Sequence, residues 1–287
     1  MAKTKDKSKS KSGKRARRKA PGPTMAERAD RHELYEASVQ SVEDEIEFLD
    51  RAFRELSGRR PKVMREDFCG TAAAACAWVR EKRSRRAVAV DIDPEVLEWG
   101  RARHAADLKN GQRERLTLVN GDVRTAETGT VDFTVAFNFS WWTFRTREAL
   151  RGYFAAVRDS LAPDGVFFLD IYGGSGAYEE GEEETEYDGF TYVWDQSRFE
   201  PVAADYTCYI HFRFPDGSEL PRAFEYHWRL WTLPELREVL AEAGFAESHV
   251  YWQTTNRRGE LTGEFERADS GEADPAWIAY VAACKGG

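Results

Sequence analysis

Short apolar runs alternate with amphipathic stretches through the middle of the chain, between Pro61 and Tyr172. The apolar runs predict strands at 62–68, 87–90, 116–119, 131–137 and 166–172. Apolar residues recurring at helical spacing predict helices at 72–79, 93–108 and 149–161. Apolar strands alternating with helices are typical of βαβ units, in which helices cover both faces of a parallel sheet.

Two further helices are expected before this region. Thr24 is a plausible N-cap for a helix over 25–35. Ser41 is expected to cap a second helix, in which Ile46, Phe48, Leu49, Phe53 and Leu56 recur at helical spacing. Ser57-Gly58 would end it.

The pattern changes after Gly173. Residues 178–188 are strongly acidic and are expected to form a mobile loop. Alternation then predicts strands at 190–194, 206–214 and 223–231, with a hairpin turn at 215–218. A helix over 233–243 and strands at 249–253 and 277–283 complete the chain. The expected fold class is therefore α/β. It has a Rossmann-like, seven-stranded, mostly parallel sheet with helices on both faces, and an antiparallel β insert (174–231) between the fifth strand and the following helix.

Charge divides the chain into two parts. Residues 1–20 carry ten Lys or Arg against one Asp, so with a net charge of −8 the remainder carries −17. The segment 1–23 has no apolar residues to bury and is expected to be a disordered basic tail before one domain at 24–287. No apolar run could span a bilayer, and no secretory signal is recognisable. The four cysteines show no metal-binding spacing, so a reduced, cytoplasmic protein without a metal is expected.

Three polar signals follow successive predicted strands. A small-residue turn at Cys69-Gly70-Thr71 follows the first strand, where backbone N–H groups can approach a ligand closely. Asp91 ends the second strand, in the position from which an acidic residue binds ribose hydroxyls. Asp122 follows the third strand and can accept a hydrogen bond from an adenine amino group. Because these strand ends share one sheet edge, the three predict a nucleotide-type cofactor site. NAD is disfavoured because residues 68–73 lack its G-x-G-x-x-G turn.

The turn Glu66-Asp67-Phe68-Cys69-Gly70-Thr71-Ala72 resembles the first motif of class I S-adenosylmethionine-dependent methyltransferases. Phe68 and Ala72 stand where two of the usual glycines would be. The motif Asp67-Phe68-Cys69-Gly70-Thr71 is similar to that of a bacterial subgroup of these enzymes. The resemblance to this subgroup extends over about residues 32–284. The resemblance implies S-adenosylmethionine as cofactor, with Ile92 against the adenine and either Glu66 or Asp67 at the methionine ammonium. The expected cofactor-binding residues are Glu66, Asp67, Phe68, Cys69, Gly70, Thr71, Asp91, Ile92, Asp122, Val123 and Asn138.

The fourth strand ends in Asn138-Phe139-Ser140-Trp141-Trp142, at the edge where a methyl acceptor would lie. Aromatic walls exclude water and stabilise cationic charge, both of which suit methyl transfer. The insert supplies more aromatic residues and is interpreted either as a lid or as a dimer element. Substrate-binding candidates are Ser140, Trp141, Trp142, Tyr192, Trp194 and Trp228. Catalytic candidates are Asn138, Tyr172, His211 and His227.

The main hypothesis is a methyltransferase acting on a small-molecule acceptor. A protein or RNA methyltransferase tethered by the basic tail is an alternative, although an acidic body disfavours nucleic acid. A non-catalytic S-adenosylmethionine-binding protein is a second alternative. No membrane partner is expected, and a homodimer is compatible with the insert.

Overall fold

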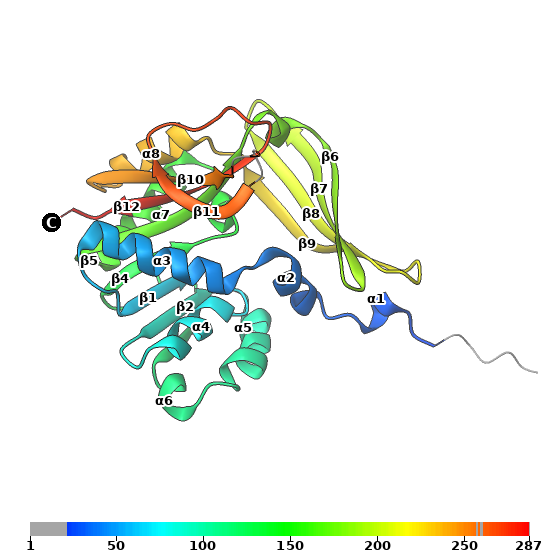
Figure 1. Cartoon of the computed structure of the whole chain (residues 1–287), viewed down its shortest axis with the longest axis horizontal. Coiled ribbons are helices and arrows are strands. Elements are labelled where there is room, and N and C mark those ends of the chain that lie inside the picture. Colours follow the sequence, from blue (N-terminus) through cyan, green and yellow to red (C-terminus); the bar gives the residue numbers. More distant parts are fainter. Residues whose placement is uncertain (1–21, 257, 259–260, 287) are drawn as a thin grey trace, which may run out of the picture.

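The computed structural model describes residues 22–256, 258 and 261–286. Most of the predicted basic tail lies outside these residues. The main sheet has eight strands in the order β11-β10-β12-β5-β4-β1-β2-β3 (Figure 1). Its first five strands in the chain are mutually parallel, as expected. They are β1 (Val63–Asp67), β2 (Arg86–Asp91), β3 (Leu116–Asn120), β4 (Val131–Ala136) and β5 (Leu161–Gly173).

Three later strands complete the main sheet. β12 (Trp277–Cys284) runs antiparallel between β5 and β10 (Glu247–Thr255). The eighth strand, β11 (Leu261–Ala268), lies at the edge beside β10 and makes the expected count of seven wrong by one. Most of β11 is exposed, so it lacks the alternation by which a half-buried strand is recognised.

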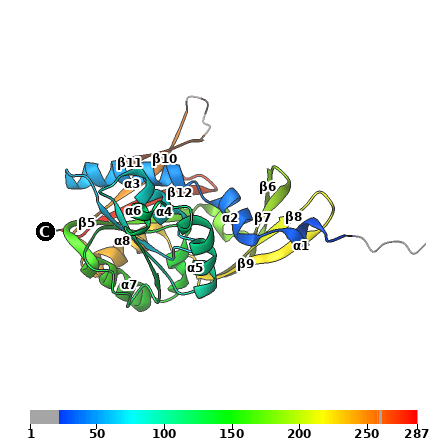
Figure 2. The same ribbon diagram turned by 90° about the horizontal axis from the view of Figure 1, so that it is seen from below.

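Helices cover both faces of this sheet, as predicted (Figure 2). One face packs against helices that share a buried cluster including Phe53, Trp78 and Leu97. They are α3 (Val42–Ser57), α4 (Ala73–Glu81), α5 (Pro94–Gly100) and the π-helical turn η1 (Arg101–Ala105); the short α6 (Asn110–Arg113) follows η1. The other face packs against α7 (Arg147–Ser160) and α8 (Leu233–Glu242), through a cluster that includes Phe154 and Leu236.

The helix expected over 25–35 is two helices. Thr24 caps α1 (Met25–Arg28) with a capping box, but Asp30 then starts α2 (Arg31–Val39). The Asp30 carboxylate accepts hydrogen bonds from the backbone N–H groups of His32 and Glu33, and from Trp99 Nε1 at 2.7 Å. Tertiary contact at this cap therefore breaks a helix that local propensity would continue.

The insert forms a separate four-stranded antiparallel sheet, in the order β6-β7-β8-β9, beside the carboxyl end of the parallel strands (Figure 1). Its strands are β6 (Gly181–Tyr187), β7 (Phe190–Glu200), β8 (Asp205–Arg213) and β9 (Glu219–Arg229), preceded by the 3-10 turn η3 (Ser175–Tyr178). The acidic stretch expected to be a mobile loop is thus mostly strand β6. Glu182 and Glu184 form ion pairs with Arg213, which offsets their mutual repulsion.

The four cysteines are free thiols, in agreement with the reduced state expected from the sequence. Among the described residues, no helix combines the length and the apolar character needed to cross a membrane.

Candidate active site

The turn between β1 and α4 has an unusual backbone. Phe68, Gly70 and Ala72 have φ values of 56°, 52° and 58°, all in the left-handed region. These alternate positions are the ones that glycine usually occupies in the motif it resembles. A left-handed φ costs a non-glycine residue about 1–2 kcal/mol. The chain therefore keeps a glycine-type turn although two of its three residues are not glycine. A Cβ at Gly70 would meet nothing within 4 Å, so the turn is open to a ligand there.

Asp91 joins this turn to the end of β2. Its carboxylate accepts hydrogen bonds from the backbone N–H of Gly70 at 2.8 Å and of Asp93 at 2.9 Å. The side chain is half-buried, and burial raises its pKa above the usual value. The remaining lone pairs of this carboxylate can accept hydrogen bonds from a ligand.

The two acidic residues that end β1 face opposite sides of the sheet. Asp67 is buried against Arg65, whose Nε lies 2.6 Å from it, and it accepts a hydrogen bond from the Tyr153 hydroxyl at 2.9 Å. Glu66 points the other way and accepts a hydrogen bond from the backbone N–H of Ala75 at 2.9 Å. Since Asp67 already has a cation partner, Glu66 is the better placed of the two for a ligand ammonium.

Glu66 belongs to a group of buried acids at the carboxyl edge of the sheet. Burial, together with the charges of Glu45, Asp91 and Asp67, raises the pKa of Glu66 to about 8. Burial likewise raises the pKa of Glu45, on α3, to about 7. Glu45 and Glu66 line the same small cavity of about 30 Å³ behind the β1–α4 turn. Buried carboxylates without a cation are unfavourable unless protonated or paired, so this cavity favours a cationic group.

The loop after β4 is held by Asp170 of β5. Asn138 and Phe139 both have left-handed φ values, 57° and 54°. Their backbone N–H groups donate to the Asp170 carboxylate at 2.6 and 2.9 Å. Burial raises the pKa of Asp170 to about 8. Sequence reasoning missed this residue, because nothing in an apolar strand signals that one of its carboxylates will bind the loop of the neighbouring strand β4.

Trp141 and Trp142 lie in the short turn η2 (Ser140–Thr143) and are fully buried. Trp141 Nε1 donates to the Asp170 carbonyl at 2.9 Å. Trp142 packs on Tyr172, with ring centroids 4.9 Å apart. Neither tryptophan lines the cavity beside the β1–α4 turn, and both pack in the core, so the structure gives no support to their assignment to substrate binding. Tyr172 also lies behind this layer, against Phe139.

The insert turns an aromatic face toward the site. Phe224, Tyr226 and Trp228 of β9 line the cavity. Tyr192 and Trp194 lie on the same face, but they pack against Phe212 and against Tyr226 and Trp228 respectively, behind the cavity wall. Tyr226 and Trp228 share one face of β9, as the alternation predicts.

The two histidines proposed as bases lie on the other face of the insert. His227 is paired across strands with Thr207, is exposed, and contacts Glu225 at 2.7 Å. His211 lies 3.3 Å from Asp195 and accepts a hydrogen bond from the Arg222 N–H. Neither histidine lines the cavity beside the β1–α4 turn, so the structure gives no support to their assignment as catalytic bases. The alternation that places Tyr226 on the inner face already places His227 on the outer one.

Helix α2 closes the cavity from the N-terminal side. Its Tyr35 packs on Phe224 of the insert, with ring centroids 4.8 Å apart. Glu36 accepts hydrogen bonds from Thr71 Oγ1 at 2.5 Å and lies 2.6 Å from His104 Nε2. The helix is thus fixed to both the β1–α4 turn and the insert, contacts that the sequence does not indicate.

Between these elements lies one cavity of about 280 Å³. It contains Gly70, Asp91 and Asn138 from the predicted constellation, with α2 on one side and β9 on the other. The residues that line it are His32, Tyr35, Gln40, Phe68, Cys69, Gly70, Thr71, Asp91, Asn138, Ser140, Phe224, Tyr226 and Trp228.

The residues expected around an adenine lie outside this lining. The Asp122 carboxylate is bound by Arg124, through Nε at 3.0 Å and the backbone N–H at 2.9 Å. Ile92 is 71% exposed, and Val123 is buried. They lie just after β2 and β3, at the same sheet edge as Asp91.

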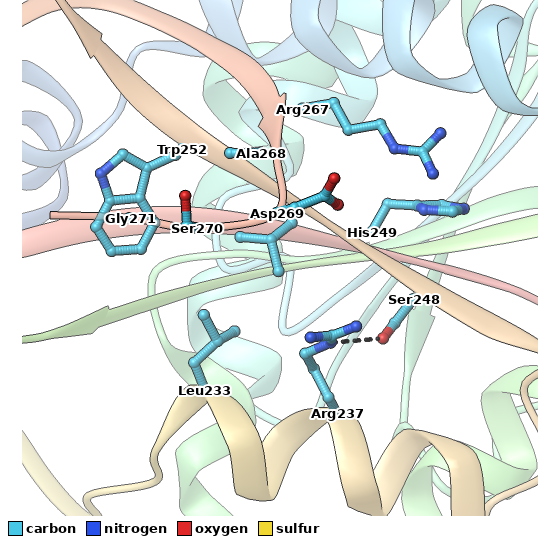
Figure 3. A pocket seen from close by; sticks show the side chains of 11 residues that line it. Leu233, Arg237, Ser248, His249, Trp252, Arg267, Ala268, Asp269, Ser270 and Gly271 are labelled. Atoms are coloured by element: carbon cyan, nitrogen blue, oxygen red, sulfur yellow. Dashed lines mark hydrogen bonds between the residues drawn. The ribbon is translucent and has the colours of Figure 1, made fainter.

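A second cavity, of about 250 Å³, lies between α8 and the edge strands β10 and β11 (Figure 3). It is lined by Arg237, His249, Trp252 and Arg267, among others, and Arg237 Nε donates to Ser248 Oγ at 3.2 Å. It contains none of the residues predicted for the cofactor or the acceptor.

Comparison with known proteins assigns the central segment of the chain to a family. Residues 68–165 match the family described as "Methyltransferase domain". No curated protein gives a significant match.

Solved structures share the fold at low sequence identity. An S-adenosylmethionine-dependent methyltransferase from Clostridium acetobutylicum has 17% identity and a TM-score of 0.63, over 89% of this chain and 98% of that one. CalS10, an amino pentose methyltransferase from Micromonospora echinaspora, has 18% identity and a TM-score of 0.60, over 87% and 95%. The sugar N-methyltransferase KedS8 from Streptoalloteichus has 15% identity and a TM-score of 0.58, over 92% and 96%.

The family match begins at the β1–α4 turn and covers Asp91 and the loop after β4. Together with the fold and the implied cofactor, S-adenosylmethionine, it identifies the chain as an enzyme that transfers methyl groups. The chain therefore contains a methyltransferase domain, and it shares its fold with solved S-adenosylmethionine-dependent methyltransferases.

Proposed function

We propose that the chain binds S-adenosylmethionine at the β1–α4 turn and transfers its methyl group to a small molecule enclosed by α2 and the insert. One observation carries this proposal: the turn that begins the family match and the aromatic face of β9 line the same cavity of about 280 Å³. Enclosed sites of roughly this size are typical of small ligands. Extended polymers need an open groove.

The described residues fit the proposed cofactor at two places. Asp91 offers a carboxylate beside Gly70, where no side chain obstructs approach. Ribose hydroxyls are the groups that an acid in this position binds. At the other end, Glu66 and the half-buried Glu45 line one small cavity and would hold the methionine ammonium. In the cofactor-free protein the burial of negative charge on these carboxylates is unfavourable. A bound cation would interact favourably with the same charge.

S-adenosylmethionine supplies an electrophilic methyl group on a sulfonium. The protein's task is then to align a nucleophile with that methyl and to exclude water. Asn138 lines the cavity at the end of β4, so its side chain remains the best-placed polar candidate for contact with the acceptor. Phe224, Tyr226 and Trp228 form an aromatic wall suited to an acceptor that carries an amine, because aromatic faces stabilise cationic charge.

Two structural relatives are described as an amino pentose methyltransferase and a sugar N-methyltransferase. These descriptions support a small polar acceptor here, and amine-bearing sugars are the first compounds to test. The inner face of the insert packs on α2 and closes the site, which supports the lid interpretation of 174–231. A homodimer stays a prediction.

The test is transfer of a labelled methyl group into a cell extract separated by size. We expect the wild-type protein to label molecules below about 1 kDa, the size range that such a pocket encloses. Label found only in protein or RNA would overturn the small-molecule proposal. Within β9, Trp228→Leu should raise KM for the acceptor. His227→Asn, on the opposite face of the same strand, is the matched control and should leave KM unchanged.

A further inference from the structure

Three metal-ligating side chains meet on one face of the main sheet, and none of them lines the cavity beside the β1–α4 turn. Glu247 and His249 lie two residues apart on β10, so they project from the same face. Cys284 of β12 is the direct cross-strand partner of Glu247. One ligand atom from each of the three lies within 4.8 Å of the others. The His249 Nε2 is 3.3 Å from a Glu247 carboxylate oxygen.

We propose that Glu247, His249 and Cys284 form a binding site for Zn²⁺ or a metal of similar preference. In tetrahedral zinc sites, bond lengths of about 2.0–2.3 Å place neighbouring ligand atoms roughly 3.3–3.6 Å apart. The His249–Glu247 separation already has this value. One thiolate, one imidazole and one carboxylate are all zinc ligands, and solvent at the exposed Glu247 side can provide the fourth.

The scaffold favours such a site because two of the ligands are fixed by strand pairing. Glu247 and Cys284 are cross-strand partners on β10 and β12. On its other side β12 is paired with β5 along its whole length. Ligand positions on paired strands need little ordering when a metal binds.

The charged neighbours of this cluster come from four elements. His249 is influenced by Glu247 on β10, Arg267 on β11, Glu55 on α3 and Arg237 on α8. A neutral imidazole and a thiolate are the forms that bind metals, and a metal with high thiolate affinity, such as Zn²⁺, displaces the thiol proton on binding.

The position of the cluster separates it from methyl transfer. Cys284 pairs with Val166 near the beginning of β5, whereas the site lies at the carboxyl end of β5, where Trp277 pairs with Gly173. A metal here would tie β10 to β12 and would not meet the acceptor. The proposal is therefore independent of the proposed function.

Cobalt is the appropriate probe, because Co²⁺ replaces Zn²⁺ and its absorption reports thiolate ligation. Co²⁺ is titrated into the tag-free full-length chain and then displaced with Zn²⁺. We expect one equivalent of Co²⁺ with a thiolate charge-transfer band, lost in Cys284→Ser. Glu247→Gln should weaken binding by at least about tenfold, the minimum for loss of a group that supports a metal.

His227→Asn is the matched control. His227 also contacts a carboxylate, Glu225 at 2.7 Å, but no third ligand joins that pair among the described residues. It should bind Co²⁺ like the wild type. Absence of saturable one-to-one binding, or a charge-transfer band that persists in Cys284→Ser, would overturn the proposal. If Cys284→Ser loses its native circular dichroism, Glu247→Gln decides alone, because the Glu247 side chain is exposed and its replacement should not disturb the fold. Unchanged Co²⁺ affinity in Glu247→Gln refutes the site.

Discussion

The substitution Glu66→Gln should stabilise the cofactor-free protein and weaken cofactor binding at the same time. Gln keeps an oxygen that can accept the hydrogen bond from the Ala75 N–H, and it removes the buried charge. Burial raises the pKa of Glu66 from an ordinary 4.5 to about 8. Between these two values the folded protein retains a proton that the unfolded chain releases. Stability due to this group is therefore fully present below about pH 4.5 and is lost as the pH rises toward 8.

The size of the effect follows from this pKa difference. Each unit of pKa corresponds to about 1.4 kcal/mol, so the wild type should lose about 3 kcal/mol between pH 5 and pH 7.5 through Glu66 alone. Glu45 and Asp170 also have raised pKa values and add loss in the same direction. The contribution of Glu66 alone is therefore the difference between the wild type and Glu66→Gln in how much free energy of unfolding is lost between the two pH values. This difference should have the same order of magnitude as the loss calculated for Glu66.

The assay is urea unfolding of both proteins at the two pH values, followed by calorimetric titration with S-adenosylmethionine. Glu66→Gln should show the shallower pH dependence and bind the cofactor at least about tenfold more weakly, because a charge-assisted hydrogen bond to the ammonium is lost. Glu98→Gln, whose side chain is 73% exposed, is the control. Equal pH dependence in the wild type and Glu66→Gln would refute the buried-charge argument. Equal cofactor affinity would refute the assignment of Glu66 to the ammonium.

Three further outcomes are expected. Ala72→Gly should raise the free energy of unfolding by about 0.5–1 kcal/mol, because its φ of 58° suits glycine, whereas Ala75→Gly within α4 should lower it by about 1 kcal/mol; urea unfolding measures both. His211→Asn and His227→Asn should keep kcat within about twofold of the wild type in a methyl-transfer assay, and a loss of a hundredfold, as for a general base, would contradict their placement away from the site. Asp170→Asn should destabilise the protein by about 1–3 kcal/mol in the same unfolding assay, because its amide would face one of two backbone N–H donors; a change below 0.5 kcal/mol would be inconsistent with this contact.

The core of the fold could be predicted from the sequence because its central strands β1, β4 and β5 are mostly buried and the parallel strands appear as apolar runs. The five parallel strands lie within a few residues of their predicted positions, apart from the longer β5. The two strands that sequence reasoning missed, β6 and β11, are mostly exposed edges. Their stability comes from pairing with a neighbour, which leaves no periodicity to detect.

The cofactor side could be predicted in part, because Gly70 and Asp91 are placed by the ends of consecutive strands. The acceptor side could also be predicted only in part, since Asn138, Ser140 and Trp228 line the cavity as expected. Tyr35 and Glu45 reach the two ends of the site from N-terminal helices, through contacts that no local pattern encodes. Trp141 shows a different difficulty: an aromatic residue at a functional strand end can equally well belong to the core, and only its packing in the structure distinguishes the two.

The central claim is that Asp91 and the turn at Gly70 hold S-adenosylmethionine. Calorimetric titration of the cofactor into the wild type and Asp91→Asn tests it most directly. Charge-assisted hydrogen bonds contribute about 1.5–3 kcal/mol each, so the affinity of Asp91→Asn should fall by at least tenfold and toward a hundredfold. Asp164→Asn, which alters a surface ion pair with Arg59, should bind like the wild type. Cofactor affinity within threefold of the wild type in a folded Asp91→Asn would contradict the account.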